Sequence, residues 1–202
     1  WFLQRLEYHL YEPDSSLRND SYYISVLEEA LTSGHLDGMM RIRPLYQLKM
    51  LKKNRIGIKA ADFTFILSTG ELQNLWDISA KYTLLLFYDP DCIYCRQSMM
   101  ELSESSIINS FLQHSGLSLS QLALVTICME GEIDMWKEYQ QSLPSVWING
   151  YDVRKVLTEK ELYFLRSLPS IYLLGEDKQV LLKEPSSISE VTSYLLNKYD
   201  DI

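Results

Sequence analysis

The 202-residue sequence has few cysteines, little glycine and no long hydrophobic run. No apolar stretch approaches the ~20 residues that a membrane-spanning helix needs. Three cysteines are too few for a disulfide scaffold in a chain of this length, and eight scattered glycines leave little material for a phosphate-binding glycine loop. Basic residues are also outnumbered, and the net charge of −8 disfavours nucleic acid as a partner.

What the sequence does contain is enough apolar material for a packed core. Hydrophobic residues make up 47% of the chain and aromatic residues 12%, which argues against disorder. The sequence begins at Trp1 rather than at a methionine, which is consistent with a signal peptide or a lipid anchor ahead of residue 1.

Residues 1–58 are expected to form a small helical region. Apolar residues recur at helical spacing over residues 1–11, and Pro13 closes that segment. A second helix is predicted from an N-cap at Asp20 or Ser21 to Gly34. A third is predicted over residues 36–55, broken or kinked at Pro44.

Residues 59–202 have the pattern of an α/β domain. Short apolar runs of strand length alternate with helical segments, which predicts a three-layer fold with a central mixed sheet flanked by helices. The expected strands are 62–67, 82–89, 122–130, 170–175 and 178–184; the expected helices are a short one within 68–81, one from the cysteine pair to near His114, one over 134–141 and a closing one over 186–199. Residues 142–169 are expected to be a connection.

The stretch "FYDPDCIYCRQ" places Cys92 and Cys95 directly after a predicted buried strand and at the start of a predicted helix. The first N–H groups of a helix are unpaired and partially positive, so they stabilise a thiolate there. The two-residue gap puts both sulfurs on one side of the first turn. Cys92 is therefore expected to be the exposed nucleophile and Cys95 the resolving thiol.

Two other interpretations of the cysteine pair are weaker. A metal site would need two further ligands, and none of the three histidines has ligand spacing relative to the pair, so no metal is predicted. Two cysteines in a core would give no chemistry; Cys128, inside a predicted strand, fits that description better. No cofactor is predicted, because a dithiol itself carries two electrons.

The dithiol together with "SLPSIYLL" resembles the thioredoxin-like superfamily. The resemblance implies a cis-proline at Pro169 beside the active cysteines, with the backbone of Leu168 free to pair with an extended substrate. Pro144, in "SLPSVW", is an alternative; Pro169 is preferred because a strand, a turn and another strand follow it.

Three segments, "AADFTFILSTGELQNLW", "KYTLLLFYDPDCIYCR" and "LPSIYLLGEDKQVLLKE", resemble the TlpA-type thiol–disulfide oxidoreductases of bacteria. That resemblance covers residues 59–202, and residues 1–58 resemble a helical extension that precedes such domains. It implies thiol–disulfide exchange in the periplasm or cell envelope, with a disulfide-containing protein or a small thiol as substrate and a thiol–disulfide protein as upstream electron donor.

The sequence departs from the family pattern where a proton acceptor for Cys95 is usual. Leu86 stands at the position of the buried aspartate of thioredoxins, and Ser98 at the position of a glutamate found in some TlpA-type reductases. Glu101, on the same predicted helix, or water would have to serve. Between the cysteines lie Ile93 and Tyr94, and Tyr94 with Tyr88 is expected to form a rim for peptide substrates, unless both tyrosines are ordinary packing residues.

Three charged residues are expected to tune the dithiol. Carboxylates at Asp89 and Asp91 oppose a thiolate on Cys92, whereas the helix terminus and Arg96 favour it. The balance predicts a relatively reducing couple and hence a protein disulfide reductase. Two alternatives remain: a disulfide oxidase or isomerase that uses the same cysteines, and a non-catalytic binding or scaffold module with residues 1–58 as its interaction surface.

Overall fold

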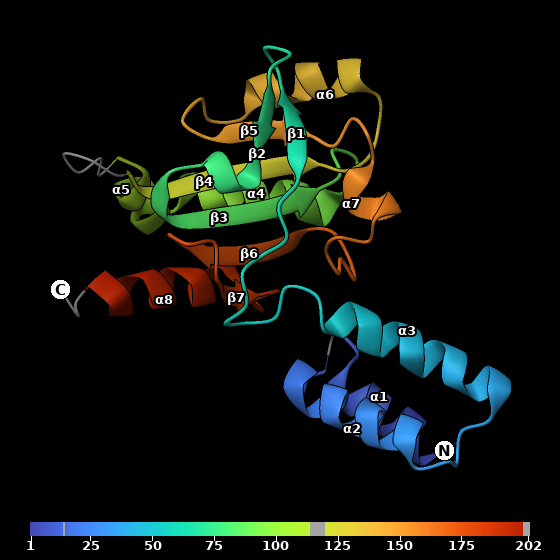
Figure 1. Ribbon diagram of the computed structural model, residues 1–202. Helices are drawn as coiled ribbons and strands as arrows, with labels where there is room; N and C mark the ends of the chain where they lie inside the picture. Colours follow the sequence, from blue (N-terminus) through green and yellow to red (C-terminus); the bar gives the residue numbers. More distant parts are fainter. Residues whose placement is uncertain (14, 114–119, 200–202) are drawn as a thin grey trace. The chain divides into compact units, whose positions relative to one another are not determined.

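The computed structural model describes residues 1–13, 15–113 and 120–199. The chain forms two compact units, Trp1–Lys53 and Asn54–Ile202 (Figure 1).

The first unit is helical. It contains α1 (Phe2–Leu10), α2 (Asp20–Thr32), a short 3₁₀ helix η1 (Gly38–Arg41) and α3 (Ile42–Leu51). The N-cap of α2 is Asn19, one residue before the first predicted cap, and its side chain accepts a hydrogen bond from the Tyr22 N–H at 3.0 Å. Within this unit, α2 contributes the buried side chains Tyr23, Ile24, Leu27 and Leu31.

The break predicted at Pro44 falls slightly earlier, where η1 ends at Arg41 and α3 begins at Ile42. The segment expected to be one helix is η1 followed by α3, and Pro44 lies in the first turn of α3. Backbone N–H groups in a first helical turn have no partner within the helix, so a residue without an N–H costs nothing there.

The second unit is built on a seven-stranded sheet with the order β2-β1-β5-β4-β3-β6-β7. Strands β3, β4 and β5 are parallel to one another, whereas β6, β7, β1 and β2 join by antiparallel pairing, so the sheet is mixed. The strands are β1 (Thr64–Leu67), β2 (Leu72–Asn74), β3 (Ala80–Tyr88), β4 (Ser120–Cys128), β5 (Ile148–Tyr151), β6 (Ser170–Gly175) and β7 (Val180–Lys183).

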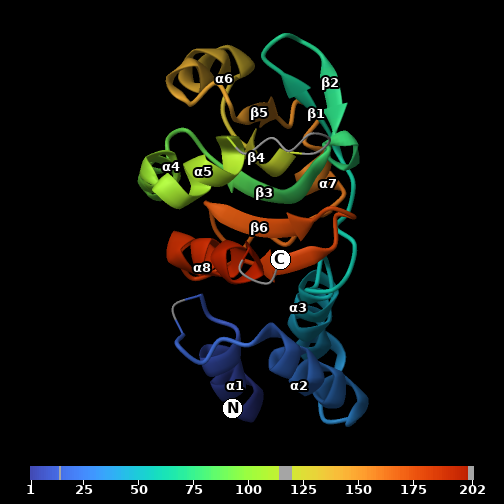
Figure 2. The ribbon, with the colours of Figure 1, turned by 90° about the vertical axis from the view of Figure 1, so that its left-hand side faces the viewer.

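Helices cover both faces of this sheet, which is the predicted three-layer α/β fold. Figure 2 shows α4, α5 and α8 on one side of the central strands and α7 on the other. The helices of the unit are α4 (Ile93–Glu104), α5 (Ser106–Gln113), α6 (Ile133–Tyr139), α7 (Val156–Glu159) and α8 (Ile188–Tyr199), with 3₁₀ helices η2 (Leu75–Asp77) and η3 (Gln140–Ser142).

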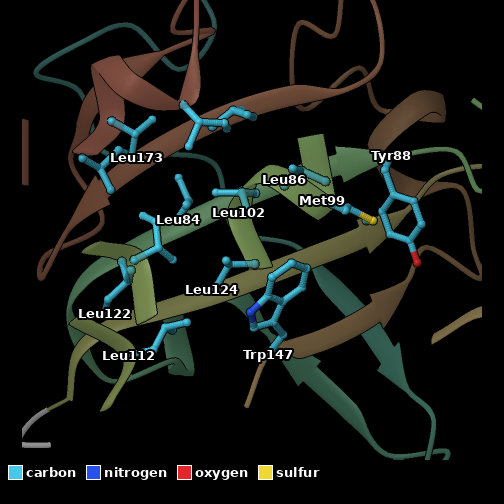
Figure 3. Packing of buried hydrophobic residues seen from close by; sticks show 14 of the residues in the cluster. Leu84, Leu86, Tyr88, Met99, Leu102, Leu112, Leu122, Leu124, Trp147 and Leu173 are labelled. Atoms are coloured by element: carbon cyan, nitrogen blue, oxygen red, sulfur yellow. The ribbon is translucent and has the colours of Figure 1, made fainter. Parts of the chain in front are cut away.

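Strand β3 is the centre of the unit and supplies both cores. Because side chains alternate along a strand, Leu84, Leu86 and Tyr88 belong to one core and Leu85 and Phe87 to the other. All five are fully buried. Figure 3 shows the first core, in which the even-numbered residues of β3 pack with Met99 and Leu102 of α4. This packing fixes α4 at the end of β3.

Three elements differ from the sequence-based expectation. The segment 68–81, expected to hold a short helix, contains the 3₁₀ helix η2 and, before it, strand β2, which was not predicted and pairs with β1. The predicted connection contains β5 and α7. The helix expected to run from the cysteine pair to His114 is two helices, separated at Ser105, whose hydroxyl accepts a hydrogen bond from the Ile108 N–H. His114 lies outside the described residues.

Candidate active site

The cysteine pair lies at the carboxyl end of β3, where the loop of residues 89–92 leads into α4. Side-chain and backbone hydrogen bonds hold this loop. The Cys92 N–H donates to the Asp89 carbonyl at 3.1 Å, and the Asp91 N–H donates to Asp89 Oδ1 at 2.9 Å. Arg96, one turn into α4, donates from Nη1 to the Pro90 carbonyl at 2.9 Å. The loop that presents Cys92 is therefore fixed at both of its ends.

Cys92 is the N-cap of α4, and its sulfur accepts a hydrogen bond from the Cys95 N–H at 3.4 Å. Cys92 is half-buried, whereas Cys95 is completely buried. Both thiols are free and lie close together. A negative charge on the Cys92 sulfur would face the positive end of the helix, which stabilises a thiolate.

Burial separates the roles of the two cysteines. Burial is the largest cause that raises the pKa of Cys95 to about 12, and the proximity of Cys92 and the charge of Asp89 act in the same direction, whereas the Asp89 backbone partly offsets the rise. Cys95 is therefore a neutral thiol at pH 7. The partly exposed Cys92 is the sulfur that a substrate disulfide can approach.

Strand β6 brings a second segment to the same place. Ser170 pairs with Phe87, so the residues before β6 lie at the carboxyl end of β3. The Leu168–Pro169 peptide bond is cis, and the Cys92 thiol lies 3.6 Å from the Leu168 carbonyl oxygen as a hydrogen-bond donor. Pro144 precedes β5 and has a trans peptide bond; Leu168–Pro169 is the one cis bond among the residues that the structure describes.

The two residues between the cysteines are exposed, Ile93 by 65% and Tyr94 by 70%. They are therefore available to a substrate. Tyr88 is not, because its side chain points into the core beside Met99 and is fully buried (Figure 3). Of the two interpretations of Tyr88, a substrate rim and ordinary packing, the structure shows packing, because Tyr88 ends a strand that is buried on both faces.

None of the positions considered in the sequence for a proton acceptor is well placed beside Cys95. Leu86 is buried and carries no ionisable group, and Ser98 is a hydroxyl one turn further along α4. Glu101 is exposed to solvent although Cys95 is buried on the same helix. The carboxylate whose charge does reach Cys95 is that of Asp89.

No pattern in the sequence indicates the residues of α6 that lie near Cys95. Tyr139 of α6 donates a hydrogen bond to Met99 Sδ at 3.5 Å, and its own pKa is raised by burial and also by the proximity of Cys95. Met99 follows Cys95 by one helical turn, a spacing that places both on one face of α4. No comparable pattern connects Tyr139 to the cysteines, because its position depends on how α6 packs.

Cys128 ends β4 beside Tyr88 and is fully buried, as expected for a core cysteine. Its thiol donates to the Glu130 carbonyl at 3.1 Å, and burial raises its pKa to about 12. Within the described ranges, no three histidine, cysteine or acidic side chains form a group that could hold a metal ion. Among the helices of the same residues, none is long and apolar enough to cross a membrane.

A thioredoxin-like protein from Bacteroides caccae has the same architecture over nearly the whole chain. It is 34% identical, the match covers 96% of this chain and 68% of that one, and the TM-score is 0.89. The chain belongs to the thioredoxin-like family. The C-terminal domain of an uncharacterized protein from Bacteroides fragilis is 36% identical to this thioredoxin-like chain, with 71% of it and 98% of the other chain covered and a TM-score of 0.66.

More distant thioredoxin-like structures share the fold. The thioredoxin domain of a thiol-disulfide oxidoreductase from Bacteroides vulgatus is 22% identical, with 70% of this chain and 98% of that chain covered and a TM-score of 0.57. Residues 1–54 match the model of a domain of unknown function, DUF5106. No curated protein matches the thioredoxin-like chain.

Proposed function

We propose that this protein is a thiol–disulfide oxidoreductase that reduces disulfide bonds through Cys92 and Cys95. The observation that carries the proposal is the position of the Cys92 sulfur. It receives a hydrogen bond from the first turn of α4 and lies against the Leu168 carbonyl beside the cis peptide bond. A nucleophilic sulfur is thus placed next to backbone that an extended peptide can pair with.

The reaction has two steps that the different burial of the thiols separates. The Cys92 thiolate attacks one sulfur of a substrate disulfide, and the other substrate sulfur leaves as a thiolate. Cys95 then attacks the Cys92 sulfur of the mixed disulfide, which releases the second substrate sulfur and leaves an intramolecular Cys92–Cys95 disulfide. The substrate gains two electrons, and a dithiol donor returns them to the protein.

The surroundings of the dithiol support reduction as the direction. Asp89 and Asp91 place carboxylates in the loop before Cys92, whereas the guanidinium of Arg96 is hydrogen-bonded to the loop backbone at Pro90. A thiolate next to carboxylates is less stabilised, which favours the disulfide form of the protein and makes its dithiol a better reductant.

The finer assignment rests on the sequence resemblance. We assign residues 59–202 to the TlpA-type branch, preceded by a helical extension over residues 1–58, and place the protein in the periplasm or cell envelope of a bacterium. Its substrates would be disulfide-containing proteins or small thiols, and a thiol–disulfide protein would be its electron donor. The exposure of Ile93 and Tyr94 supports a peptide substrate.

An insulin-reduction assay tests the proposal. We expect the parent protein to reduce insulin with dithiothreitol as donor, and both Cys92→Ser and Cys95→Ser to lose that activity. Cys128→Ala is the matched control, since Cys128 is buried outside the dithiol, and we expect it to retain activity. No activity in the folded parent would instead favour a binding module, and an equilibrium potential near that of strong oxidants would favour an oxidase.

A further inference from the structure

Two acidic loops leave the sheet side by side at the end that carries the dithiol. Strands β3 and β4 are parallel neighbours, and Tyr88 and Cys128 are partners in the last pair of their register. The pairing continues one residue further, because the Met129 N–H donates to the Tyr88 carbonyl at 2.9 Å. The loop of residues 89–92, which leads into α4, therefore has the loop of residues 129–132 beside it.

These two loops contain no lysine or arginine and carry four carboxylates, those of Asp89, Asp91, Glu130 and Glu132. All four residues are exposed to solvent except Asp89, which is half-buried. Within the part of the chain that the structure describes, none of the four takes part in an ion pair. Burial is the largest cause of the raised pKa of Cys128, and the charges of Asp89 and Glu130 add to it. The surface beside the dithiol is therefore negatively charged.

Basic residues near these loops offset only part of that charge. Arg96 of α4 donates a hydrogen bond to the Pro90 carbonyl at 2.9 Å, so its guanidinium lies against the first loop. Lys137 of α6 lies 3.6 Å from Asp134, which is a fifth carboxylate at the start of that helix. The basic residues 154–155 follow β5, which β4 separates from β3. Carboxylates thus outnumber basic groups around the dithiol.

Cys92 lies between this negative surface and the backbone with which an extended substrate can pair. Strands β4 and β6 flank β3 on opposite sides, so the loop of residues 129–132 and the Leu168–Pro169 peptide lie on opposite sides of the dithiol. A substrate chain whose sulfur reaches Cys92 therefore comes close to the carboxylates. Tyr94, which is 70% exposed, adds an aromatic face against which an ammonium or guanidinium group can lie.

We propose that the dithiol acts preferentially on disulfides whose neighbouring residues are lysine or arginine, an inference that rests on the proposed function. The loop carboxylates attract positive side chains beside the substrate sulfur, which raises the rate of productive encounter. An acidic segment, or a small thiol with a net negative charge, is repelled from the same surface. The two acidic loops thus select cationic protein segments among the disulfides that a dithiol can reduce.

Three synthetic peptides test this selectivity. Each contains the same intramolecular disulfide, and the positions that flank the cysteines hold lysine, glutamine or glutamate. Reaction of each peptide with dithiothreitol, an uncharged dithiol, corrects for its intrinsic reactivity. In single turnovers of the reduced protein at about 10 mM salt, we expect the lysine peptide to react about five- to tenfold faster than the glutamate peptide. The ratio should approach one at about 1 M salt, where charges are screened.

Removal of the charge from one loop should weaken the selectivity. Glu130→Gln combined with Glu132→Gln should lower the lysine-to-glutamate rate ratio by about threefold at low salt. The matched control is Glu71→Gln combined with Glu176→Gln. It removes two exposed carboxylates, and hence the same net charge, from turns at the other end of the sheet. This control should leave the ratio unchanged.

Three results would overturn the inference. They are equal rates for the lysine and glutamate peptides at low salt, an unchanged ratio in the double variant of Glu130 and Glu132, and an equal loss of selectivity in the control variant. The last result would assign the selectivity to the net charge of the protein instead of to the loops. Failure of the reduced protein to react with any of the three peptides would contradict the proposed function itself.

Discussion

At the scale of single residues, burial decides what each cysteine can do. Cys92 and Cys95 are separated by two residues, yet one is partly accessible and the other is enclosed by the packing of α4 on β3. Burial keeps Cys95 protonated until a partner removes its proton, and accessibility lets Cys92 meet the substrate. The order of attack follows from this difference.

The role of the pair could be predicted from its place between a buried run and a helix start, whereas a proton acceptor for Cys95 could not. The family positions hold Leu86 and Ser98, neither of which is an acid, and Glu101 is exposed to solvent. The sequence predicts Asp89 only as a charge that opposes a thiolate. Which side chains lie near Cys95 depends on how the loop after β3 folds and on how α6 packs, and no spacing in the sequence expresses it.

Gly150 is important because the side chains of Phe65 and Ile127 lie close to its backbone. A Cβ atom at this position in β5 would lie 2.3 Å from Cδ2 of Phe65 and 2.9 Å from Cδ1 of Ile127. We expect Gly150→Ala to lower the free energy of unfolding by about 1–3 kcal/mol in urea titrations, since the aromatic ring must move out of its packed position.

The matched control is Gly175→Ala in β6, where the added Cβ would meet its nearest atom at 3.4 Å. Gly175→Ala should lower the free energy of unfolding clearly less than Gly150→Ala does. Phe65→Leu should also reduce the penalty of Gly150→Ala when the two are combined, because the ring atoms that clash are removed. Equal losses for the two glycine variants would contradict the packing account.

At the scale of elements, the strongly patterned strands and the closing helix could be predicted, and β5 could not. Strands β3, β4 and β6 are nearly continuous apolar runs, as buried central strands are. Strand β5 is only four residues long and contains the pair Asn149-Gly150, which is typical of a turn. Gly150 instead leaves room for the Phe65 ring, which only the tertiary structure reveals.

Helix α7, which follows β5, depends on one buried carboxylate. Both oxygens of Asp152 accept N–H groups of the helix start, from Val156 at 2.9 Å and from Leu157 at 3.0 Å. Burial raises the pKa of Asp152, and these two hydrogen bonds only partly offset that effect. The native state therefore binds the Asp152 proton more tightly than the unfolded chain does.

The raised pKa of Asp152 in the native state determines how the stability of the protein changes with pH. The contribution of Asp152 to the free energy of unfolding is greatest below the pKa that this residue has in the unfolded chain, near 3.8. It decreases as the pH rises through the higher pKa of the native state. We expect Asp152→Asn to cost about 1 kcal/mol at low pH and less near neutrality, measured by urea unfolding at several pH values. Asp134→Asn, which removes an exposed carboxylate, is the control. A cost of Asp152→Asn that grows with pH would contradict this account.

At the scale of the whole molecule, the second unit contains the sheet, both cores and every residue of the candidate site. Its first residues belong to it through specific contacts. Asn54 donates from Nδ2 to the Leu162 carbonyl and accepts from the Ala61 N–H, and residues 57 and 58 exchange backbone hydrogen bonds with Val180.

We expect residues 54–202 alone to unfold cooperatively and to reduce insulin at a rate within about twofold of the full chain. A shorter piece, 59–202, lacks the four hydrogen bonds described above and should be less stable by about 2–4 kcal/mol. Asn54→Gly in the longer piece should reduce the stability by part of that difference. Glycine tolerates the φ of 46° at this position, so the change removes the side-chain hydrogen bonds without straining the backbone. Equal stability of the two pieces would refute the assignment of residues 54–58 to this unit.

The backbone pairing of residues 57–59 alongside β7 has a further consequence for solubility. An exposed edge strand of a sheet has unpaired N–H and C=O groups, and a strand of another molecule can pair with them. Here that border is occupied, through Val180 and through the bridge between Lys59 and Gln179, while the opposite border ends in β2, a strand of three residues. Neither edge of the described sheet therefore offers a long unpaired strand on which fibres could grow in a concentrated solution.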